Sequence, residues 1–429
     1  MKVFEKEKFQ TLTVFILFSI LLYAPNIAFA GEISLPDFLQ LVKENNNTLR
    51  SSVSSLESTY YAVRAAVAPQ RPSLGVQGST NTVTSQATEN TLSAGLTGRI
   101  DISGTYGPQE KSAILGYRIQ AERHADLVNS ILGAAEEVFW RASMARENIL
   151  LNEKILAERA ENLRVTREKY KQDLIPRLDV IRAEARVEES RSLLTQARAD
   201  YKDLLARMVS LSGGSDMEPL YTSLEVGEYP TRIDFEETCQ MRPDIQALEL
   251  ALERSKVDRL LASKGLAPTL DAFMGWTIAT DGDFVTPPDN ELLLSLTLNV
   301  PVTDGKETRN RVSEKEEIIR ASEQELLARK DEALAEITQA HNRLEKALAL
   351  KATKEKEVLL ADEELRITTL LYQEGLGSQL DLLNAQTDQA RASTERLDAM
   401  KELYLAVVDI KKACGNYATE YTDRQNFRY

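Results

Sequence analysis

The sequence predicts a mainly α-helical protein with a small β part, built from two similar halves. This fold class follows from an internal repeat, from long stretches almost free of glycine and proline, and from pairs of short alternating segments. Gly213 recurs as Gly415, 202 residues later, and Pro72 recurs as Pro268, 196 residues later. Self-similarity at about 200 residues indicates two structural units built on one plan. The longest recurring set comprises Tyr170, Leu174, Leu178, Asp179 and Ala183, which return as Tyr372, Leu376, Leu380, Asp381 and Ala385.

The composition favours long helices over a compact core filled with aromatic side chains. Charged residues make up 28% of the 429 residues, and aromatic residues make up only 6%. This balance is typical of extended helical proteins. The formal net charge is −14 and no basic stripe offsets it, so we expect no nucleic-acid partner. The acidity is better suited to solvation or to the lining of a cavity.

The first 30 residues have the pattern of an export signal. Lysines at positions 2, 6 and 8 precede an apolar run from 12 to 23, and Ala-Phe-Ala at 28–30 supplies a cleavage site. An N-terminal membrane anchor is the alternative, but the run is short for a span. No cysteine stands directly after the cleavage site, so we expect no N-terminal lipid. Because no later apolar run is long enough for a membrane helix, membrane insertion would have to use β-strands.

Two segments in each half alternate between apolar and polar side chains, which indicates strands with two unlike faces. We expect them at about 74–84 and 92–102 in the first half, and at about 271–278 and 292–300 in the second. About ten residues with one apolar face suit a transmembrane strand. The alternative is an antiparallel sheet packed on helices. The polar face, suited to a water-filled lumen, comprises Ser93, Thr97, Arg99, Ser295, Thr297 and Asn299.

A long helix follows each pair of strands. Residues 306–374 contain no glycine and no proline, which at ~1.5 Å per residue allows a helix of roughly 100 Å. Apolar residues at alternating steps of three and four between Val187 and Leu211 indicate coiled-coil packing. Breaks at 173–177 and 375–378 turn each long helix back on itself. Each half should therefore contain a helix, a β-hairpin and a long helical hairpin.

These features divide the chain into five parts. Residues 1–30 form the signal peptide, 31–214 the first structural repeat, 215–232 a linker, 233–415 the second repeat and 416–429 a C-terminal tail. The chain has two cysteines, Cys239 and Cys414, which lie near the ends of expected helices. Export permits a disulfide between them, but two unpaired thiols remain an open alternative.

Four amphipathic strands per chain are too few to close a barrel. An open sheet edge in lipid leaves backbone groups unpaired, so spanning strands would require several chains to share one barrel. Two chains would give eight strands and an interior filled by side chains. Three chains would give twelve strands and room for a pore.

The order of elements and the repeated turn segment resemble the TolC family of outer-membrane efflux proteins. The segment reads Tyr-x-x-x-Leu-x-x-x-Leu-Asp-(Val/Leu)-(Ile/Leu)-x-Ala at each turn, and the likeness covers about residues 33–415. The resemblance implies a homotrimer whose long coiled-coil hairpins form a trimeric α-barrel in the periplasm, and whose strands form a shared twelve-stranded transmembrane β-barrel. It also implies an outer-membrane location. The implied partners are a periplasmic adaptor (membrane fusion) protein, an inner-membrane transporter and outer-membrane lipid.

The helical turns contain the site residues that the resemblance implies. Tyr372 and Asp381 match family positions at the closed periplasmic entrance, and Asp179 matches the partner turn. Capping of the returning helices is the alternative role for both aspartates. Gly377 stands where some family members carry a gate arginine, and Arg177 is a candidate substitute. The expected adaptor-docking tip comprises Leu174, Ile175, Pro176, Gly375, Leu376 and Gly377.

The sequence contains no sign of catalysis, of a cofactor or of a metal centre. His124 and His341 stand alone on expected helices, and no cluster has the spacing of metal ligands. No glycine-rich phosphate loop follows a strand. We interpret the chain as the channel subunit of a tripartite efflux pump or type I secretion system, a passive duct and not an enzyme. The alternatives are an exported periplasmic coiled-coil scaffold and a trimeric adhesin-like stalk, both without pore activity.

Overall fold

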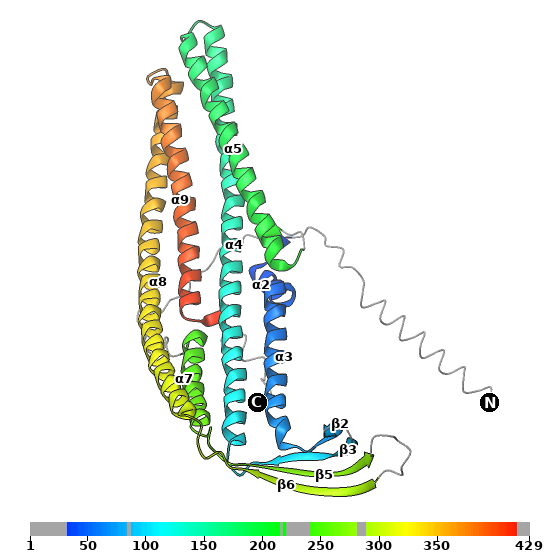
Figure 1. The fold of residues 1–429 in the computed structure, drawn as a ribbon. Helices are drawn as coiled ribbons and strands as arrows, with labels where there is room; N and C mark the ends of the chain where they lie inside the picture. The colour runs from blue at the N-terminus through cyan, green and yellow to red at the C-terminus, as the bar shows by residue number, and fades with distance from the viewer. Residues whose placement is uncertain (1–31, 84–86, 215–217, 220–240, 281–288, 418–429) are drawn as a thin grey trace, which may run out of the picture.

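The protein is elongated, with the sheet at one end and the two helical turns at the other (Figure 1). The computed structural model describes residues 32–83, 87–214, 218–219, 241–280 and 289–417. The expected signal peptide, most of the linker, most of the C-terminal tail and Cys239 lie outside these residues.

Both halves follow the predicted order of helix, paired strands and helical hairpin. The first half contains α2 (Leu35–Asn45), α3 (Asn47–Val67), the 3₁₀ turn η1 (Ala68–Gln70), β2 (Ser73–Val83), β3 (Ala87–Ile100), α4 (Tyr106–Lys171) and α5 (Arg177–Ser212). The second contains α7 (Pro243–Ala262), β5 (Thr269–Thr280), β6 (Asp289–Asn299), α8 (Glu307–Gln373) and α9 (Gln379–Ala413). The short strands β1 (Glu32–Ile33) and β4 (Glu218–Pro219) pair in parallel. The predicted fold class, mainly helical with a small sheet, is confirmed.

α4 and α8 are the long helices that the sequence predicts. They contain 66 and 67 residues, so each extends roughly 100 Å at ~1.5 Å per residue. Gly133 lies inside α4 without ending it, and a Cβ there would come within 3.3 Å of the Lys412 side chain, so the glycine allows α4 to approach the end of α9 closely. Over the described ranges, no helix combines the length and the apolarity needed to cross a lipid bilayer.

The first predicted helix is in fact two helices. The sequence predicts one helix over 33–68, but α2 ends and α3 begins on either side of Asn46. The Asn46 Oδ1 atom accepts hydrogen bonds of 3.0 and 3.2 Å from backbone N–H groups in the first turn of α3, and its Nδ2 group donates to the Leu211 carbonyl. An asparagine that caps a new helix competes with continuation of the old one. In the second half, the sequence predicts a helix over 233–264. The structure describes this helix from Pro243 onward, as α7.

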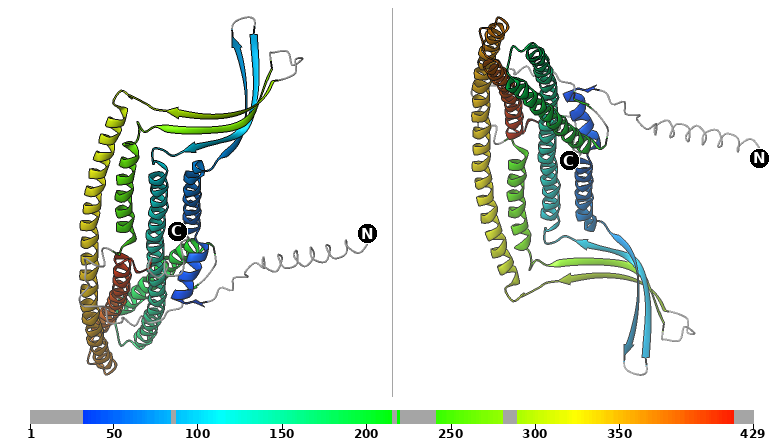
Figure 2. Two further views of the ribbon diagram at one scale, coloured as in Figure 1. Left: turned by 90° about the horizontal axis from the view of Figure 1, so that it is seen from below. Right: turned by 90° about the horizontal axis from the view of Figure 1, so that it is seen from above.

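The four longer strands form one antiparallel sheet in the order β2-β3-β5-β6. Its register gathers the apolar side chains on one face, because Trp276 stands opposite both Ala94 and Leu292. This face is solvent-exposed in the single chain and comprises Leu74, Val76, Leu92, Leu96, Met274, Trp276, Leu292, Leu294, Leu296 and Leu298. Figure 2 shows the sheet as a curved ribbon that extends sideways from the helix ends. A continuous exposed apolar face of this kind marks a surface that contacts lipid or protein.

α4 is the central helix of the rod, since it packs against α3, α5, α7 and α9. The main core cluster lies around Phe139 and Trp140, and the Trp140 and Tyr404 ring centroids are 4.6 Å apart. A second cluster joins α7, α8 and α9 through Ile245, Ile337, Leu403 and Val407. The Phe139–Trp140 pair therefore belongs to the core.

Candidate functional site

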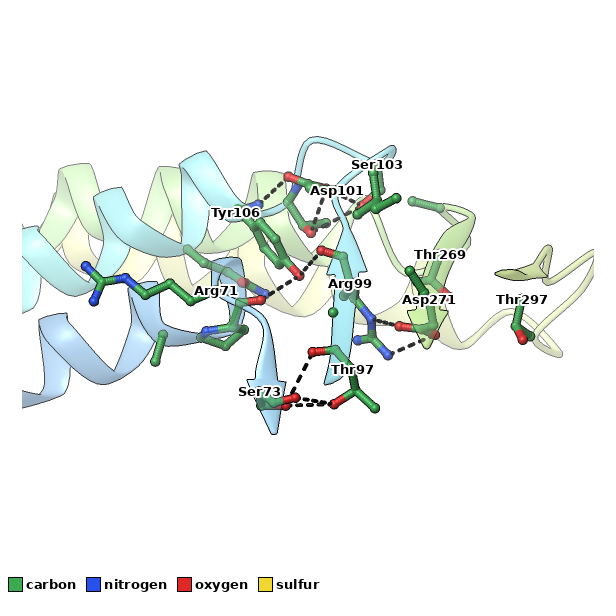
Figure 3. Close-up of a pocket in the computed structure, with 18 of the residues that line it drawn as sticks. Arg71, Ser73, Thr97, Arg99, Asp101, Ser103, Tyr106, Thr269, Asp271 and Thr297 are labelled. Atoms are coloured by element: carbon green, nitrogen blue, oxygen red, sulfur yellow. Dashed lines mark hydrogen bonds and ion pairs between the residues drawn. The ribbon is translucent and has the colours of Figure 1, made fainter. Parts of the chain in front are cut away.

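The base of the sheet gathers charged side chains around a cavity of about 910 Å³. The cavity lies between the polar face of the sheet and the ends of α3, α4 and α7 (Figure 3). Arg99 of β3 and Asp271 of β5 are register partners, and Arg99 Nε donates to Asp271 Oδ1 at 2.7 Å. Thr97 and Thr297 lie on the same face. The polar face predicted from the sequence therefore extends across β3, β5 and β6 at this level.

Asp101 fixes the change of direction from β3 into α4. Its carboxylate accepts hydrogen bonds from the backbone N–H groups of Thr105 at 3.0 Å and Tyr106 at 2.9 Å (Figure 3). Burial alone would raise the pKa of Asp101, but these hydrogen bonds outweigh burial and hold its pKa at about 2. The carboxylate stays ionised and anchors the first turn of α4.

At the opposite end, each hairpin turns within a few residues. Asp173 (φ 56°) and Gly375 (φ 74°) take the left-handed conformation at equivalent positions of the two turns. The six residues of the expected docking tip all lie between the hairpin helices, at 174–176 and 375–377. Leu174 and Leu376 are 66% and 78% exposed. Each turn therefore presents a large apolar side chain to its surroundings.

Tyr372 lies in the seam between the two hairpins. Its side chain is buried, and Lys169 Nζ of α4 lies 3.7 Å from the centre of its ring, a cation–π contact. Burial raises the pKa of the Tyr372 hydroxyl, and the nearby Asp179 carboxylate adds to the rise. The structure thus brings two predicted site residues, Tyr372 of the second hairpin and Asp179 of the first, close enough to interact electrostatically.

Polar side chains continue this seam along α4 and α9. Gln379 Nε2 donates to Thr166 Oγ1 at 3.2 Å, and Asn162 Nδ2 donates to Gln386 Oε1 at 3.3 Å. Sequence reasoning missed these four residues. A signal was present, because Asn162, Thr166 and Lys169 follow the same four-and-three spacing as the apolar core positions. Polar residues at such positions indicate a helix contact held by hydrogen bonds.

The two predicted site aspartates differ in their local contacts. Asp381 forms a capping box with Ser378: the Asp381 N–H donates to Ser378 Oγ at 3.1 Å, and the Ser378 N–H donates to Asp381 Oδ2 at 3.3 Å. α5 begins without a side-chain cap, and the Asp179 carboxylate instead lies 3.7 Å from Arg182. Arg177 is exposed and makes no ion pair with any residue that the structure describes.

A third polar cluster joins α7 to α8 midway along the rod. Arg242 contacts Asp244 at 2.9 Å and Glu336 at 2.7 Å, and Arg329 contacts Asp244 at 2.8 Å. Burial alone would raise the pKa of Asp244, but the hydrogen bonds and charges of Arg242 and Arg329 outweigh burial and lower it. Asp126 of α4 faces the same cluster, and burial and the Asp244 carboxylate raise its pKa.

The described ranges contain no group of three or more His, Cys, Asp or Glu side chains arranged to hold a metal ion. His124 is buried, and its Nδ1 atom lies 2.5 Å from Ser52 Oγ. Cys414 is partly buried and forms no disulfide with any residue that the structure describes.

A family model described as "Outer membrane efflux protein" matches residues 38–214 and 235–416. Nodulation protein T of Rhizobium leguminosarum bv. trifolii is 26% identical over 290 residues, which cover 63% of this chain and 60% of that protein. The outer membrane efflux protein BepC of Brucella suis biovar 1 (strain 1330) is 24% identical over 297 residues, 66% of this chain and 63% of that protein. The matched region thus spans less than two thirds of either curated relative.

The fold is shared with solved channel structures. The crystal structure of the Campylobacter jejuni CmeC outer membrane channel superimposes with a TM-score of 0.81 at 15% identity, over 91% of this chain and 88% of that chain. The family match covers both halves of the sequence, including the four longer strands and both helical hairpins. The chain belongs to the outer membrane efflux protein family.

Proposed function

We propose that this chain is the outer-membrane channel subunit of a tripartite efflux pump or type I secretion system. It would give cargo a passive exit duct across the periplasm and the outer membrane, while an inner-membrane transporter supplies the energy. One observation carries the proposal: an amphipathic sheet with an exposed apolar face is joined to helical hairpins whose long helices, α4 and α8, each extend roughly 100 Å. The family membership of the chain supports the same function.

The proposed assembly is a homotrimer in which three sheets share one twelve-stranded barrel. The exposed apolar face would contact lipid, and the face carrying Arg99 and Asp271 would line a water-filled lumen. Four strands cannot close on themselves, whereas twelve leave room for a pore. We also propose that the residue divisions expected from the sequence, 31–214 and 233–415, are the two units that each protomer contributes.

The two lateral edges of the helical rod support a head-to-tail assembly. α8 forms one edge, and α3 and α5 form the other (Figure 1). Unlike edges that pair in rotation close into a ring. Exposed apolar residues on the α8 edge include Ile318, Leu327, Leu348, Leu359, Leu360, Ile367 and Leu370. Those on the opposite edge are Val53, Tyr61, Leu178, Ile181 and Leu193.

The helical turns would form the periplasmic gate. Tyr372, Asp381, Asp179 and Arg177 are the proposed gate residues, and the seam between the hairpins would keep the entrance narrow. A gate held by the Lys169–Tyr372 contact and by the Gln379–Thr166 hydrogen bond opens when these contacts break. Substitution of Tyr372 and Thr166 by alanine is therefore expected to raise the single-channel conductance relative to the unchanged protein.

The tips would dock a periplasmic adaptor protein. The exposed side chains of Leu174 and Leu376 at the two turns support this assignment, because exposed apolar patches mark interaction surfaces. Ile175, Pro176, Gly375 and Gly377 complete the proposed docking tip.

Expression with the native N-terminus, membrane fractionation and planar-bilayer recording together test this function. The proposal predicts a detergent-stable trimer in the outer-membrane fraction that conducts ions. A water-soluble mature protein without conductance would contradict it and favour a periplasmic scaffold. A membrane-attached trimer without conductance would favour an adhesin-like stalk.

A further inference from the structure

An aromatic side chain interrupts the polar face of the sheet. Phe273 of β5 stands opposite Thr97 of β3 and Ser295 of β6, all on the face that carries the Arg99–Asp271 pair. Sequence alternation alone places Phe273 among polar neighbours, where a phenylalanine has no obvious packing role. Its side chain is partly buried and borders the cavity at the base of the sheet.

A pair of glycines creates the space in which the Phe273 ring lies. Gly95 and Gly275 are register partners on the same face. A Cβ at Gly275 would lie 2.6 Å from Phe273 Cζ, and a Cβ at Gly95 would lie 2.8 Å from Phe273 Cε2. The ring therefore lies over the glycine pair, against the wall of the sheet. Aromatic cover of glycine is a known device in β-sheets, and here it keeps the ring out of the space above the sheet.

The ring lies next to a neutral pair of charges. Asp271 precedes Phe273 by two residues on the same face, and Arg99 Nη2 makes a second contact with Asp271 Oδ2 at 3.4 Å. The pair carries no net charge but offers polar contacts, while the ring offers an apolar aromatic surface. Both border the same cavity of about 910 Å³.

We propose that Phe273 is a specificity-determining residue that contacts the aromatic or apolar part of cargo passing the base of the sheet. The inference rests on the proposed channel function, in which this face lines the lumen. When a cargo molecule stacks on the Phe273 ring, its polar part lies beside Arg99 and Asp271. Aromatic cargo should therefore have a longer residence time at the base of the sheet than aliphatic cargo of the same charge.

Single-channel recording with two cations of equal charge tests the proposal. The probes are tetraphenylphosphonium, which is aromatic, and tetrapropylammonium, which is aliphatic. Phe273→Ser is expected to shorten the blocks caused by tetraphenylphosphonium by about threefold to tenfold, which corresponds to the loss of one aromatic contact. Blocks by tetrapropylammonium should keep their duration. The matched control is Ser295→Ala, the cross-strand partner, which should change neither probe.

Two further variants keep the test decisive. Phe273→Leu retains bulk and apolarity but loses the aromatic face, so it should also shorten the tetraphenylphosphonium blocks, even if Phe273→Ser fails to assemble. The exchange of Phe273→Ser with Ser295→Phe moves the ring to a neighbouring strand with no glycine pair beneath it. The ring should then project into the lumen and lower the conductance.

The outcomes separate this inference from the channel function. If the unchanged protein conducts but both Phe273 variants leave the tetraphenylphosphonium blocks unaltered, the role of Phe273 is wrong and the channel function stands. If the unchanged protein forms no channel, both are wrong. Equal shortening for both probes would also overturn the aromatic assignment, because it would indicate a general change in pore width.

Discussion

At the residue scale, a buried carboxylate ties the end of α9 to α4. Glu136 is 1% exposed and accepts hydrogen bonds from Lys411 Nζ at 2.9 Å and from the Tyr417 hydroxyl at 2.6 Å. Trp140 Nε1 donates to the same carboxylate at 3.3 Å. A buried charge with three donors is satisfied, whereas removal of the carboxylate takes away the acceptor that these three donors share.

Glu136→Ala should therefore lower the free energy of unfolding by about 3 kcal/mol, because it removes the acceptor that Lys411 and Tyr417 share and leaves a cavity in its place. Thermal or denaturant unfolding of the purified protein measures this loss. Glu137→Ala is the matched control: Glu137 is 43% exposed and, among the residues that the structure describes, forms an ion pair only with Arg141 in the same helix. That pair should contribute less than about 0.5 kcal/mol. Equal losses for the two variants would contradict the argument.

The Arg242 cluster should make stability depend on pH. The folded-state pKa of Asp244 is lowered, so its stabilising contribution is present above the ordinary carboxylate pKa of about 3.9 and is lost as pH falls through the lowered value. Asp244→Asn should be less stable than the unchanged protein at pH 7, and this difference should shrink below about pH 4. Unfolding curves at several pH values measure it. A difference that stays constant down to pH 2 would show that Asp244 does not act through its charge.

Sequence patterns located the candidate gate residues on the turns but not their partners. Tyr372 and Asp381 were located because the turn segment repeats in the sequence and because it resembles the turn segment of the TolC family. The Gln379–Thr166 hydrogen bond joins residues 213 positions apart. Such a contact depends on how two hairpins pack side by side, which periodicity within either hairpin does not specify.

At the element scale, the two helical turns reverse the chain with different residues in the left-handed conformation. Gly375 takes a left-handed conformation without cost, whereas Asp173 takes it with a Cβ present. The backbone strain therefore differs between the two turns, although they occupy equivalent positions in the repeat. The first turn is therefore the less favourable of the two.

Asp173→Gly should raise the free energy of unfolding by up to about 1 kcal/mol, because it removes the steric cost of the left-handed conformation. Gly375→Ala should lower it by about the same amount, since alanine meets that cost at the second turn. A shift of the denaturant midpoint at constant slope reports both changes. Destabilisation by Asp173→Gly would indicate that the aspartate side chain itself holds the turn.

Most elements could be predicted because each has a simple period. Alternation located the four strands, and heptad spacing with an absence of glycine and proline located α8 within one or two residues. The helix break at Asn46 could not be predicted in the same way. The apolar pattern continues through it, and the break depends on a cap and on a contact with Leu211 far along the chain.

At the scale of the whole molecule, the exposed apolar edge of α8 is expected to hold the proposed trimer together. Leu359→Lys combined with Leu360→Lys places two charges at residues that are 69% and 72% exposed in the single chain. Burial of these charges in an apolar contact is unfavourable, so the trimer should dissociate. Leu150→Lys is the control, because Leu150 is 52% exposed on the central helix α4 and not on an edge.

Light scattering coupled to size-exclusion chromatography distinguishes the outcomes. The proposed assembly predicts monomers for the α8 variant and trimers for the Leu150 variant. Trimers in both would show that the α8 edge does not form the interface.

The orientation of the sheet is the central claim, and adjacent residues of one strand test it most directly. Leu294 lies on the apolar face and Ser295 on the polar face. Spin labels attached to a cysteine at either position, with Cys239 and Cys414 replaced by serine, can be exposed to a lipid-soluble or a water-soluble relaxation agent in reconstituted membranes. If the apolar face contacts lipid, the label at 294 should respond to oxygen in the lipid and the label at 295 to a water-soluble nickel complex. Water accessibility at both positions would contradict it.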